Sequence, residues 1–256
     1  MIELFIFDLD GTLASSKMPM SADMTSLLAW LLQARKVAVI SGEKFELLKM
    51  QVMNELEKVD ANLSNLHILP VSGTQHYTYD ADKSTSQMHV WKALYKKSLT
   101  ASQKFQAVAA LLEVAADLNF LDVPSCGSRI EDRGGQITFS TLGGQDAPVQ
   151  DKEQWDQTGE KRRELAVRVQ RHLPDLEVRP GGCTSVDITQ IGVNKAYGIQ
   201  QLCASTGVES DRLFYVGEKF NDEGNDYPIL QLGIDYLEVS SLNDTKAFLE
   251  NILEKL

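Results

Sequence analysis

A run of apolar residues at the start of the chain ends in two carboxylates and reads IFDLDGTL over residues 6–13. Residues 2–8 are rich in Ile, Leu and Phe and alternate little, which is typical of a strand covered on both faces. Side chains at i and i+2 project to the same face of a strand, so Asp8 and Asp10 can converge on one reacting centre at its carboxyl end. Two adjacent carboxylates repel unless a cation or a shared proton offsets them. The pair therefore indicates a magnesium site with one Asp as nucleophile and the other as acid/base, the alternative being a polar turn.

Composition excludes several classes of protein. A chain of 256 residues with 43% hydrophobic content can bury the core of one large domain or two smaller ones. The formal net charge of -11 disfavours a nucleic-acid partner and adhesion to an anionic membrane. Three widely spaced cysteines match neither a zinc pattern nor a disulfide framework, and no window approaches the ~18 apolar residues of a membrane span. We therefore expect a cytoplasmic enzyme that acts on a small molecule.

The two ends of the chain alternate strands with helices. After the first strand, the pattern predicts a helix at 23–32, a strand at 36–40, a helix at 43–58 and a strand at 67–71. It resumes with a helix at 195–206, a strand at 212–216, a helix starting near Asn225, a strand at 235–239 and a helix at 242–254. This order predicts an α/β fold with a doubly wound parallel sheet.

The middle of the chain has a different order, helix-strand-strand, which occurs twice. The first copy has a helix at 102–116 and a hairpin of strands at 128–133 and 136–140, and the second has a helix at 154–172 and strands at 176–179 and 184–189. Such a repeat predicts an antiparallel sheet with helices on one face. We expect a core formed by residues 1–83 and 190–256, with an inserted α+β domain at 84–189.

Two further segments place polar groups where core strands end. Ser41 and Gly42 follow the second strand, so a hydroxyl and backbone N–H groups can face an anion bound beside Asp8. Lys195 lies at the start of the helix that follows the insertion. Taken alone, the first is usually a turn and the second a surface residue.

A loop rich in oxygen ligands follows another core strand and reads VGEKFNDEGND over residues 216–226. Hard cations such as Mg²⁺ prefer carboxylate and carbonyl oxygens. Glu218, Asp222 and Asp226 therefore compete for the role of metal ligand.

These four segments resemble, in order, motifs I to IV of the haloacid dehalogenase (HAD) superfamily, whose members are mostly phosphatases that work through an aspartyl-phosphate. The whole chain resembles the type IIB arrangement, with a cap domain inserted between motifs II and III, and within it the eukaryotic-type phosphomannomutase family. The residues that carry this likeness are IEDRGG at 130–135, GGCTSVD at 181–187, the spacing from Asp187 to Lys195, and GND at 224–226.

The resemblance implies a role for each matching position. Asp8 is the nucleophile, Asp10 is the acid/base and gives its carbonyl to Mg²⁺, Ser41 and Lys195 meet the phosphoryl group, and Glu218 and Asp226 complete the metal shell. Most relatives carry Asp at position 218, so Glu218 adds a methylene. In the cap, the residues implied to bind substrate are Arg133, Ser185 and Asp187.

Other candidates rest on chemistry alone or depart from the family pattern. Arg129 and Arg179 are added as cationic groups, although each could equally be a surface charge. The relatives have arginines where this chain has Lys17 and Gly144. A lost guanidinium fork weakens bidentate capture of phosphate, which favours hydrolysis over mutase chemistry.

We therefore expect a magnesium-dependent phosphatase of sugar phosphates or similar small phosphoesters. The alternative is a phosphomannomutase, and a third possibility is an inactive binding module, against which the retained motif residues argue. Because mutase relatives pair through their caps, a homodimer is a further expectation.

Overall fold

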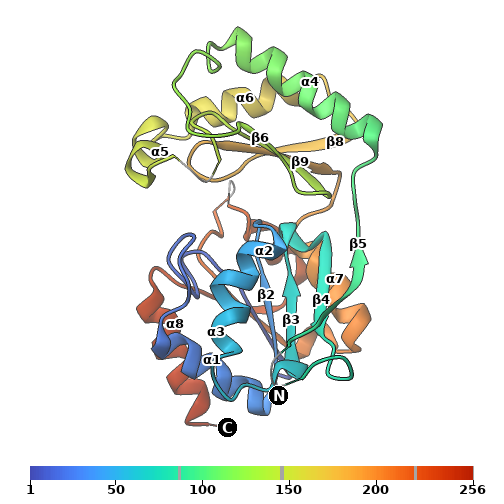
Figure 1. Cartoon of the computed structure of the whole chain (residues 1–256), viewed down its shortest axis with the longest axis vertical. Helices are drawn as coiled ribbons and strands as arrows, with labels where there is room; N and C mark the ends of the chain where they lie inside the picture. Colours follow the sequence, from blue (N-terminus) through green and yellow to red (C-terminus); the bar gives the residue numbers. More distant parts are fainter. Residues whose placement is uncertain (86–87, 145–146, 222–223, 256) are drawn as a thin grey trace. The chain divides into compact units, whose positions relative to one another are not determined.

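The computed structural model describes residues 1–85, 88–144, 147–221 and 224–255, and the chain forms two compact units (Figure 1). The core unit comprises Met1–Lys96 and Asn194–Leu256, and the inserted unit comprises Lys97–Val193. The expected insertion began at residue 84, but the strand Trp91–Lys96 belongs to the core sheet. Among the described residues, none of the helices combines the length and the apolar character that crossing a bilayer requires.

The core unit is built on a seven-stranded sheet with the order β11-β10-β1-β2-β3-β4-β5. The first five of these strands run parallel to their neighbours, and β4 and β5 add an antiparallel edge. The strands are β1 Leu4–Phe7, β2 Lys36–Ile40, β3 Leu66–Leu69, β4 Gln75–Tyr79, β5 Trp91–Lys96, β10 Leu213–Gly217 and β11 Asp235–Glu238.

Helices cover both faces of this sheet. Phe5 and Phe7 of β1 belong to an apolar cluster with α1, α8 and the helical segment at 45–56. Leu4 and Ile6, on the other face of the same strand, belong to a second cluster with α7. The doubly wound α/β core predicted from the sequence is therefore confirmed. The helices are α1 Ala22–Ala34, α2 Phe45–Leu48, the π-helix η1 Lys49–Met53, α3 Asn54–Leu56, α7 Lys195–Thr206, α8 Leu242–Leu253 and the 3₁₀ segments η2 Leu63–Asn65, η3 Val71–Gly73, η4 Ser210–Arg212 and η5 Tyr227–Leu232.

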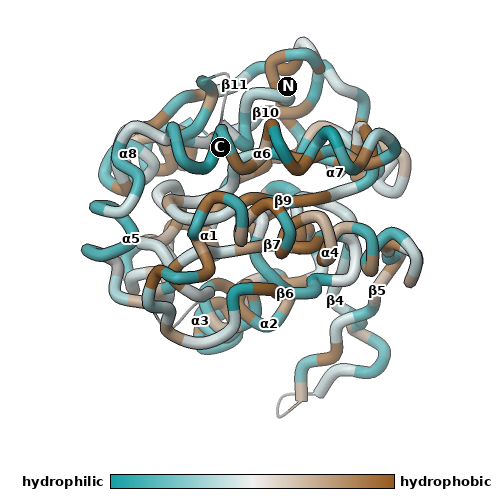
Figure 2. Tube along the Cα trace, turned by 90° about the horizontal axis from the view of Figure 1, so that it is seen from above, coloured by the Kyte–Doolittle hydropathy of each residue, from teal (hydrophilic) through white to brown (hydrophobic). Residues whose placement is uncertain are grey.

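The inserted unit is an antiparallel sheet with the order β6-β7-β9-β8 and its own apolar core. Alternate residues of β7 and β9, including Phe139 and Ile188, pack against α4 and α6, and both strands carry apolar stretches in Figure 2. The predicted α+β insertion is confirmed. Its elements are α4 Ala101–Asp117, β6 Ile130–Asp132, β7 Gln136–Ser140, α5 Val149–Trp155, α6 Glu160–Gln170, β8 Leu176–Pro180 and β9 Ser185–Gln190.

The single helix expected at 154–172 is instead two helices, α5 and α6. The carboxylate of Asp156 accepts hydrogen bonds from Lys161 N at 3.1 Å and Arg162 N at 2.9 Å, which satisfies free N–H groups at the start of a new helix. Gly159 precedes that helix with φ +75°. The local chemistry around Asp156 thus interrupts a segment whose apolar spacing looks continuous.

Two other expectations on the core differ in detail. The helix expected near Asn225 is the short 3₁₀ segment η5, with Pro228 in its first turn. The strands β4 and β5 were not predicted, because the residues between 75 and 96 lack the apolar run of a buried parallel strand. Both strands lie at the antiparallel edge of the sheet.

Candidate active site

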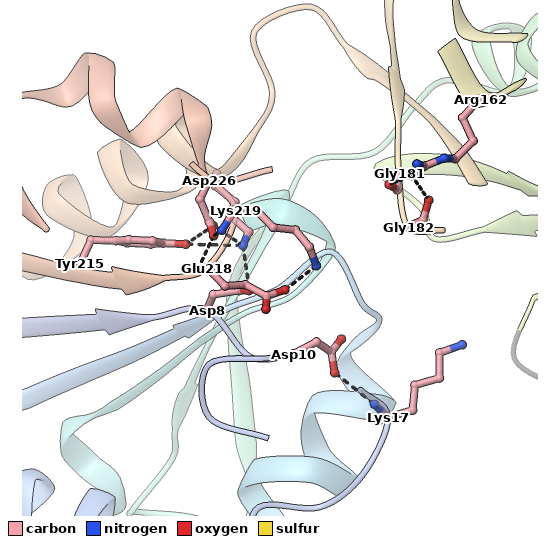
Figure 3. A network of polar contacts seen from close by, with 11 residues as sticks. Asp8, Asp10, Lys17, Arg162, Gly181, Gly182, Tyr215, Glu218, Lys219 and Asp226 are labelled. Carbon is pink, nitrogen blue, oxygen red and sulfur yellow. Dashed lines mark hydrogen bonds and ion pairs between the residues drawn. The ribbon is translucent and has the colours of Figure 1, made fainter. Parts of the chain in front are cut away.

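Asp8 follows β1 directly (Figure 3), and its side chain is buried next to the ammonium group of Lys195. Lys195 Nζ lies 2.6 Å from Asp8 Oδ1. Burial raises the pKa of the Asp8 carboxyl to about 6, while Lys195 lowers it and the Asp226 carboxylate raises it. A carboxylate held in this way is shielded from bulk water and is screened by the fixed ammonium of Lys195.

Lys195 is the first residue of α7, and the side chain of Asn194 caps this helix by accepting from Tyr197 N at 3.3 Å. The buried Nζ contacts Asp8 Oδ1 and Asp226 Oδ1, each at 2.6 Å. Burial alone disfavours the charged lysine, but the two carboxylates outweigh it and raise the pKa of Lys195 above its ordinary value. The ammonium is therefore a permanent positive charge between two carboxylates.

Asp226 is fully buried, and both of its oxygens accept hydrogen bonds. Oδ1 accepts from Lys195 Nζ and from the hydroxyl of Tyr215 at 2.5 Å. Oδ2 accepts from Glu218 N at 3.1 Å and Lys219 N at 3.0 Å. Burial works against ionisation, but Lys195 and these hydrogen bonds lower the pKa of Asp226. A carboxylate with four donors closes the 218–226 loop and has little capacity left for a metal ion.

Tyr215 lies on β10 and was not among the predicted site residues. Its side chain is fully buried, and its hydroxyl lies 3.4 Å from Lys195 Nζ besides donating to Asp226. Burial raises the pKa of Tyr215 well above its usual value, so the hydroxyl stays protonated and acts as a donor. The sequence gives no signal for this role, because a tyrosine in a buried strand normally reads as a core residue.

Glu218 follows β10 and reaches the turn after β1. Gly11 has φ +82°, and a Cβ on it would lie 1.9 Å from Glu218 Oε2. The Glu218 carboxylate therefore lies against the backbone between Asp10 and Thr12, and it also pairs with the ammonium of Lys219. A glycine at position 11 serves both the left-handed turn and this close approach.

The Asp10 carboxylate is held by two N–H donors. Its Oδ1 accepts from Lys17 N at 3.1 Å (Figure 3) and from the side chain of Gln51 at 3.2 Å. The ammonium end of the Lys17 side chain points away from Asp10 in Figure 3. Lys17 thus contacts Asp10 through its backbone rather than through its charge.

Ser41 is buried at the end of β2. Its Oγ accepts a hydrogen bond from Glu43 N at 3.1 Å, which leaves its own proton available for donation. Gly42 follows directly, and a Cβ on it would lie 3.8 Å from Ser72 Oγ, an ordinary contact distance. The predicted hydroxyl and backbone groups are therefore at the carboxyl end of β2, next in the sheet to β1.

Within the described ranges, no group of three or more His, Cys, Asp or Glu side chains is already arranged to hold a metal ion. Asp222, one of the three acidic candidates, lies outside the described residues. The remaining oxygen donors at this edge are the Asp8 carboxylate, the backbone of Asp10 and the Glu218 carboxylate. They are the hard ligands that Mg²⁺ prefers.

In the inserted unit, Ser185 and Asp187 lie together next to a glycine. A Cβ on Gly181 would lie 2.6 Å from Ser185 Oγ and 2.7 Å from Asp187 Oδ2. Burial raises the pKa of the Asp187 carboxyl, although the Arg133 guanidinium and a 2.7 Å hydrogen bond from Thr138 work against it. The side chains of Ser185 and Asp187 thus form one polar cluster on β9.

The three arginine candidates of the inserted unit differ in their contacts. Arg133 is mostly buried and pairs with Glu131 at 2.6 Å. Arg129 donates to the carbonyls of Thr141 and Val123, so its guanidinium holds the backbone together. Arg179 is exposed and pairs with Glu177. Of the three, Arg133 alone combines burial with electrostatic contact to Asp187.

Comparison with known proteins identifies chains that are similar to this one over most of its length. Residues 24–255 match the family model described as eukaryotic phosphomannomutase. The chain is 27% identical to the phosphomannomutase of Schizosaccharomyces pombe, over 88% of this chain and 84% of that one. It is 26% identical to phosphomannomutase 1 of Dictyostelium discoideum, over 98% and 96% respectively. Among solved structures, an IMP-nucleotidase of Plasmodium falciparum superposes with a TM-score of 0.69 at 16% identity, covering 100% of this chain and 68% of that one, which is a likeness of fold.

Proposed function

The chain belongs to the eukaryotic phosphomannomutase family, and from that premise we propose that it interconverts hexose 1-phosphates and 6-phosphates through a phosphoaspartate at Asp8. It is an enzyme of the HAD superfamily. The sequence alone favours hydrolysis over mutase chemistry, and the family match reverses that order. The observation that carries the proposal is the buried contact of Lys195 Nζ with both Asp8 and Asp226.

The contacts around Asp8 support its role as nucleophile. Lys195 engages Oδ1, so the other oxygen forms the bond to phosphorus while the bond from phosphorus to the leaving oxygen breaks. Lys195 screens the repulsion between this carboxylate and the anionic phosphoryl group. The hydroxyl of Ser41 and the N–H of Gly42 donate to phosphoryl oxygens. Asp10 gives a proton to the leaving oxygen and takes one back in the return step.

Mg²⁺ fits the oxygen donors at this edge of the sheet. We propose that Asp8, the carbonyl of Asp10 and Glu218 hold it, with Glu218 placed by its close contact with Gly11. Bound there, Mg²⁺ would offset the negative charge of the transferring phosphoryl group. Asp226 is better suited to ordering the loop, because its oxygens already accept four hydrogen bonds.

The inserted unit has polar groups that are suited to binding phosphate and sugar hydroxyls. We propose that Arg133 binds the second phosphate and that Ser185 and Asp187 bind sugar hydroxyls, supported by their shared polar cluster. Lys17 is a further cation for phosphate. Arg129 and Arg179 are weaker candidates, because the first holds backbone carbonyls and the second is exposed.

Hydrolysis of sugar phosphates is the second candidate function. It is favoured by Lys17 and Gly144, which stand where the family has arginines, because a weaker grip on a bisphosphorylated sugar gives water time to attack the phosphoaspartate. The substrate in either case is a small phosphorylated sugar. The cytoplasmic location expected from the sequence stays a prediction.

Phosphorus NMR distinguishes the two functions in one experiment. The protein is incubated with mannose 1-phosphate, Mg²⁺ and a catalytic amount of hexose 1,6-bisphosphate, and 6-phosphate and inorganic phosphate are followed together. We expect isomerisation to outpace phosphate release, and D8N to abolish both. Faster phosphate release would favour the phosphatase. If neither the 6-phosphate nor inorganic phosphate forms, the result would argue for a binding module.

We also propose that two copies pair through the inserted unit. Along α4, Phe105 is 76% exposed and Leu112 40% exposed, and the exposed Ala109 lies between them on the same face of the helix. Light scattering on the unmodified chain and on F105E tests this. We expect a dimer that the variant dissociates, whereas a monomer at all concentrations would refute the pairing.

A further inference from the structure

Gln51 is a fully buried polar residue in the π-helix η1, between α2 and α3. Its side-chain Nε2 donates to Asp10 Oδ1 at 3.2 Å and to the carbonyl of Met18 at 3.0 Å. Its backbone carbonyl accepts from Met20 N at 2.9 Å. One residue therefore ties a helix to both the Asp10 carboxylate and the loop that follows it. Single π-helical turns occur frequently at functional sites.

The orientation of the Gln51 amide follows from its neighbours. Asp10 Oδ1, when ionised, and the carbonyl of Met18 are acceptors, so the NH₂ end of the amide must face them. With the amide reversed, Oε1 would meet two acceptors at hydrogen-bond distance. The donor role of Gln51 toward Asp10 is thus fixed by chemistry.

This arrangement leaves the other end of the amide unsatisfied. Oε1 of Gln51 is buried and has no hydrogen-bond partner among the described residues. A buried acceptor without a partner destabilises the fold, and methionine would fill the same volume without that penalty. A buried polar group that lacks a hydrogen-bond partner is found mainly at functional sites, so the glutamine at position 51 indicates a functional role rather than a stabilising one.

The two oxygens of Asp10 are not equivalent. Oδ1 accepts from Lys17 N and Gln51 Nε2, which engages both of its lone pairs. Oδ2 receives no hydrogen bond from any residue that the structure describes. A proton on the Asp10 carboxyl therefore belongs on Oδ2.

We propose that Gln51 is a positioning residue that acts through Asp10, holding Oδ1 as an acceptor so that Oδ2 carries the transferred proton. The inference rests on the proposed function. In the phosphorylation step, a bond forms between Asp8 and phosphorus, the bond from phosphorus to the leaving oxygen breaks, and the proton on Asp10 Oδ2 moves to that oxygen. Without Gln51 the carboxyl turns more freely, and the proton is delivered less often in the correct direction.

The test compares leaving groups in the variant Q51M, which keeps the volume and removes the donor. The leaving alcohol is followed in the first turnover with p-nitrophenyl phosphate, which needs little protonation, and with a hexose phosphate, which needs it fully. We expect kcat/KM for the hexose phosphate to fall about tenfold or more, within the 10²–10⁴ that general acid catalysis supplies, and the aryl phosphate to change by less than about threefold.

Two matched variants separate positioning from structure. Gln170 in α6 of the inserted unit also bridges two backbone carbonyls, Leu173 O at 2.8 Å and Leu176 O at 2.9 Å, and its Oε1 accepts from Val178 N at 3.0 Å, so Q170M loses at least as many hydrogen bonds as Q51M without touching Asp10. It should leave the ratio of the two rates unchanged. In a D10N background, Q51M should have no further effect, because the group through which Gln51 acts is gone.

Equal losses for both substrates in Q51M, or a full additional loss in the D10N background, would overturn the inference. If Q51M does not fold, Gln51→Asn, which retains an amide one methylene shorter, undergoes the same comparison with the same expected ratio. An unmodified protein that transfers phosphate from neither substrate would refute the proposed function, and the role of Gln51 with it. If the unmodified protein transfers phosphate but Q51M leaves the ratio of the two rates unchanged, the inference about Gln51 is refuted and the proposed function is not.

Discussion

A buried histidine pair makes the stability of the core unit depend on pH. His67 Nδ1 and His76 Nε2 are 3.0 Å apart, and His76 Nδ1 lies 3.4 Å from Ser205 Oγ. Because the Ser205 hydroxyl donates to Leu202 O at 3.0 Å, it accepts from His76, whose other nitrogen then accepts from His67. Both rings are neutral in this chain of hydrogen bonds. A proton added to His76 Nε2 would face the N–H of His67 Nδ1, and the two donors would repel each other.

The size of the effect follows from the pKa values of the two rings. Burial, with a smaller contribution from His76, lowers the pKa of His67 from 6.5 to about 3, and burial lowers that of His76 from 6.5 to about 4. Below pH 6.5 the unfolded chain binds more protons than the folded one, so stability falls as the pH decreases toward 4 and then 3. Between pH 8 and pH 5, each ring lowers the free energy of unfolding by about 2 kcal/mol, and the two rings together lower it by about 4 kcal/mol.

Asp8 opposes this trend. Its pKa is raised from 3.8 to about 6, so protonation in the folded state favours folding as the pH drops through 6, by about 1 kcal/mol at pH 5. This term is common to the unmodified protein and to any variant of the histidine pair. The comparison of two proteins therefore removes it.

Urea unfolding between pH 8 and pH 5 measures the predicted slope. In the variant with both His67 and His76 replaced by glutamine, we expect lower stability at pH 8 but a decline toward pH 5 that is smaller by about 4 kcal/mol. If the free energy of unfolding depends on pH in the same way in the unmodified protein and the double variant, the argument is refuted, because the histidine pair would then titrate as it does in the unfolded chain.

The remaining predictions concern the site. In G11A, a Cβ placed 1.9 Å from Glu218 Oε2 must displace the Glu218 carboxylate, so we expect weaker Mg²⁺ binding in calorimetry. The positive φ at position 11 adds a strain of about 1–2 kcal/mol. An unchanged Mg²⁺ affinity would remove Glu218 from the metal site. In R133A, KM for a sugar phosphate should rise by a factor corresponding to about 1.5–3 kcal/mol while an aryl phosphate is little affected, and equal effects would contradict a role at the distal phosphate. In Y215F, loss of the donor to buried Asp226 should lower the free energy of unfolding by about 1.5–3 kcal/mol, and an unchanged value would mean that the 2.5 Å contact adds no stability.

The parts of the site that the sequence predicts are those fixed by local position. Asp8 and Asp10 follow the first strand two residues apart, so secondary structure alone assigns them to the carboxyl end of a parallel sheet. Lys195, at the start of a helix, was assigned to the same site by the motif pattern. The structure brings Lys195 to Asp8 across 187 positions of sequence separation. Groups that follow neighbouring parallel strands converge in any doubly wound sheet, whereas the approach of Lys195 was expected only from the order of the motifs.

The parts that the sequence does not predict depend on which way a side chain turns inside the core. Tyr215 is the middle residue of the strand β10. A strand register shifted by one residue would turn its hydroxyl to the opposite face of the sheet, so the sequence does not show which face the hydroxyl reaches. Gln51 points at Asp10 from a π-helix, whose extra residue shifts the helical periodicity. For Asp226, the sequence could not show that four donors already meet its oxygens.

Lys17 and Gly144 bear on how the phosphoaspartate is partitioned in the proposed mechanism. A phosphoryl group on Asp8 can return to the sugar or pass to water, and return requires the sugar to stay bound while it reorients. Each hydrogen bond to a charged group contributes about 1.5–3 kcal/mol, so the loss of one guanidinium fork shortens that residence by about tenfold or more. Neither replacement touches the attack on phosphorus, which the buried contacts of Asp8 govern. The departures from the family pattern should therefore change the ratio of isomerisation to hydrolysis while the first phosphorylation step keeps its rate.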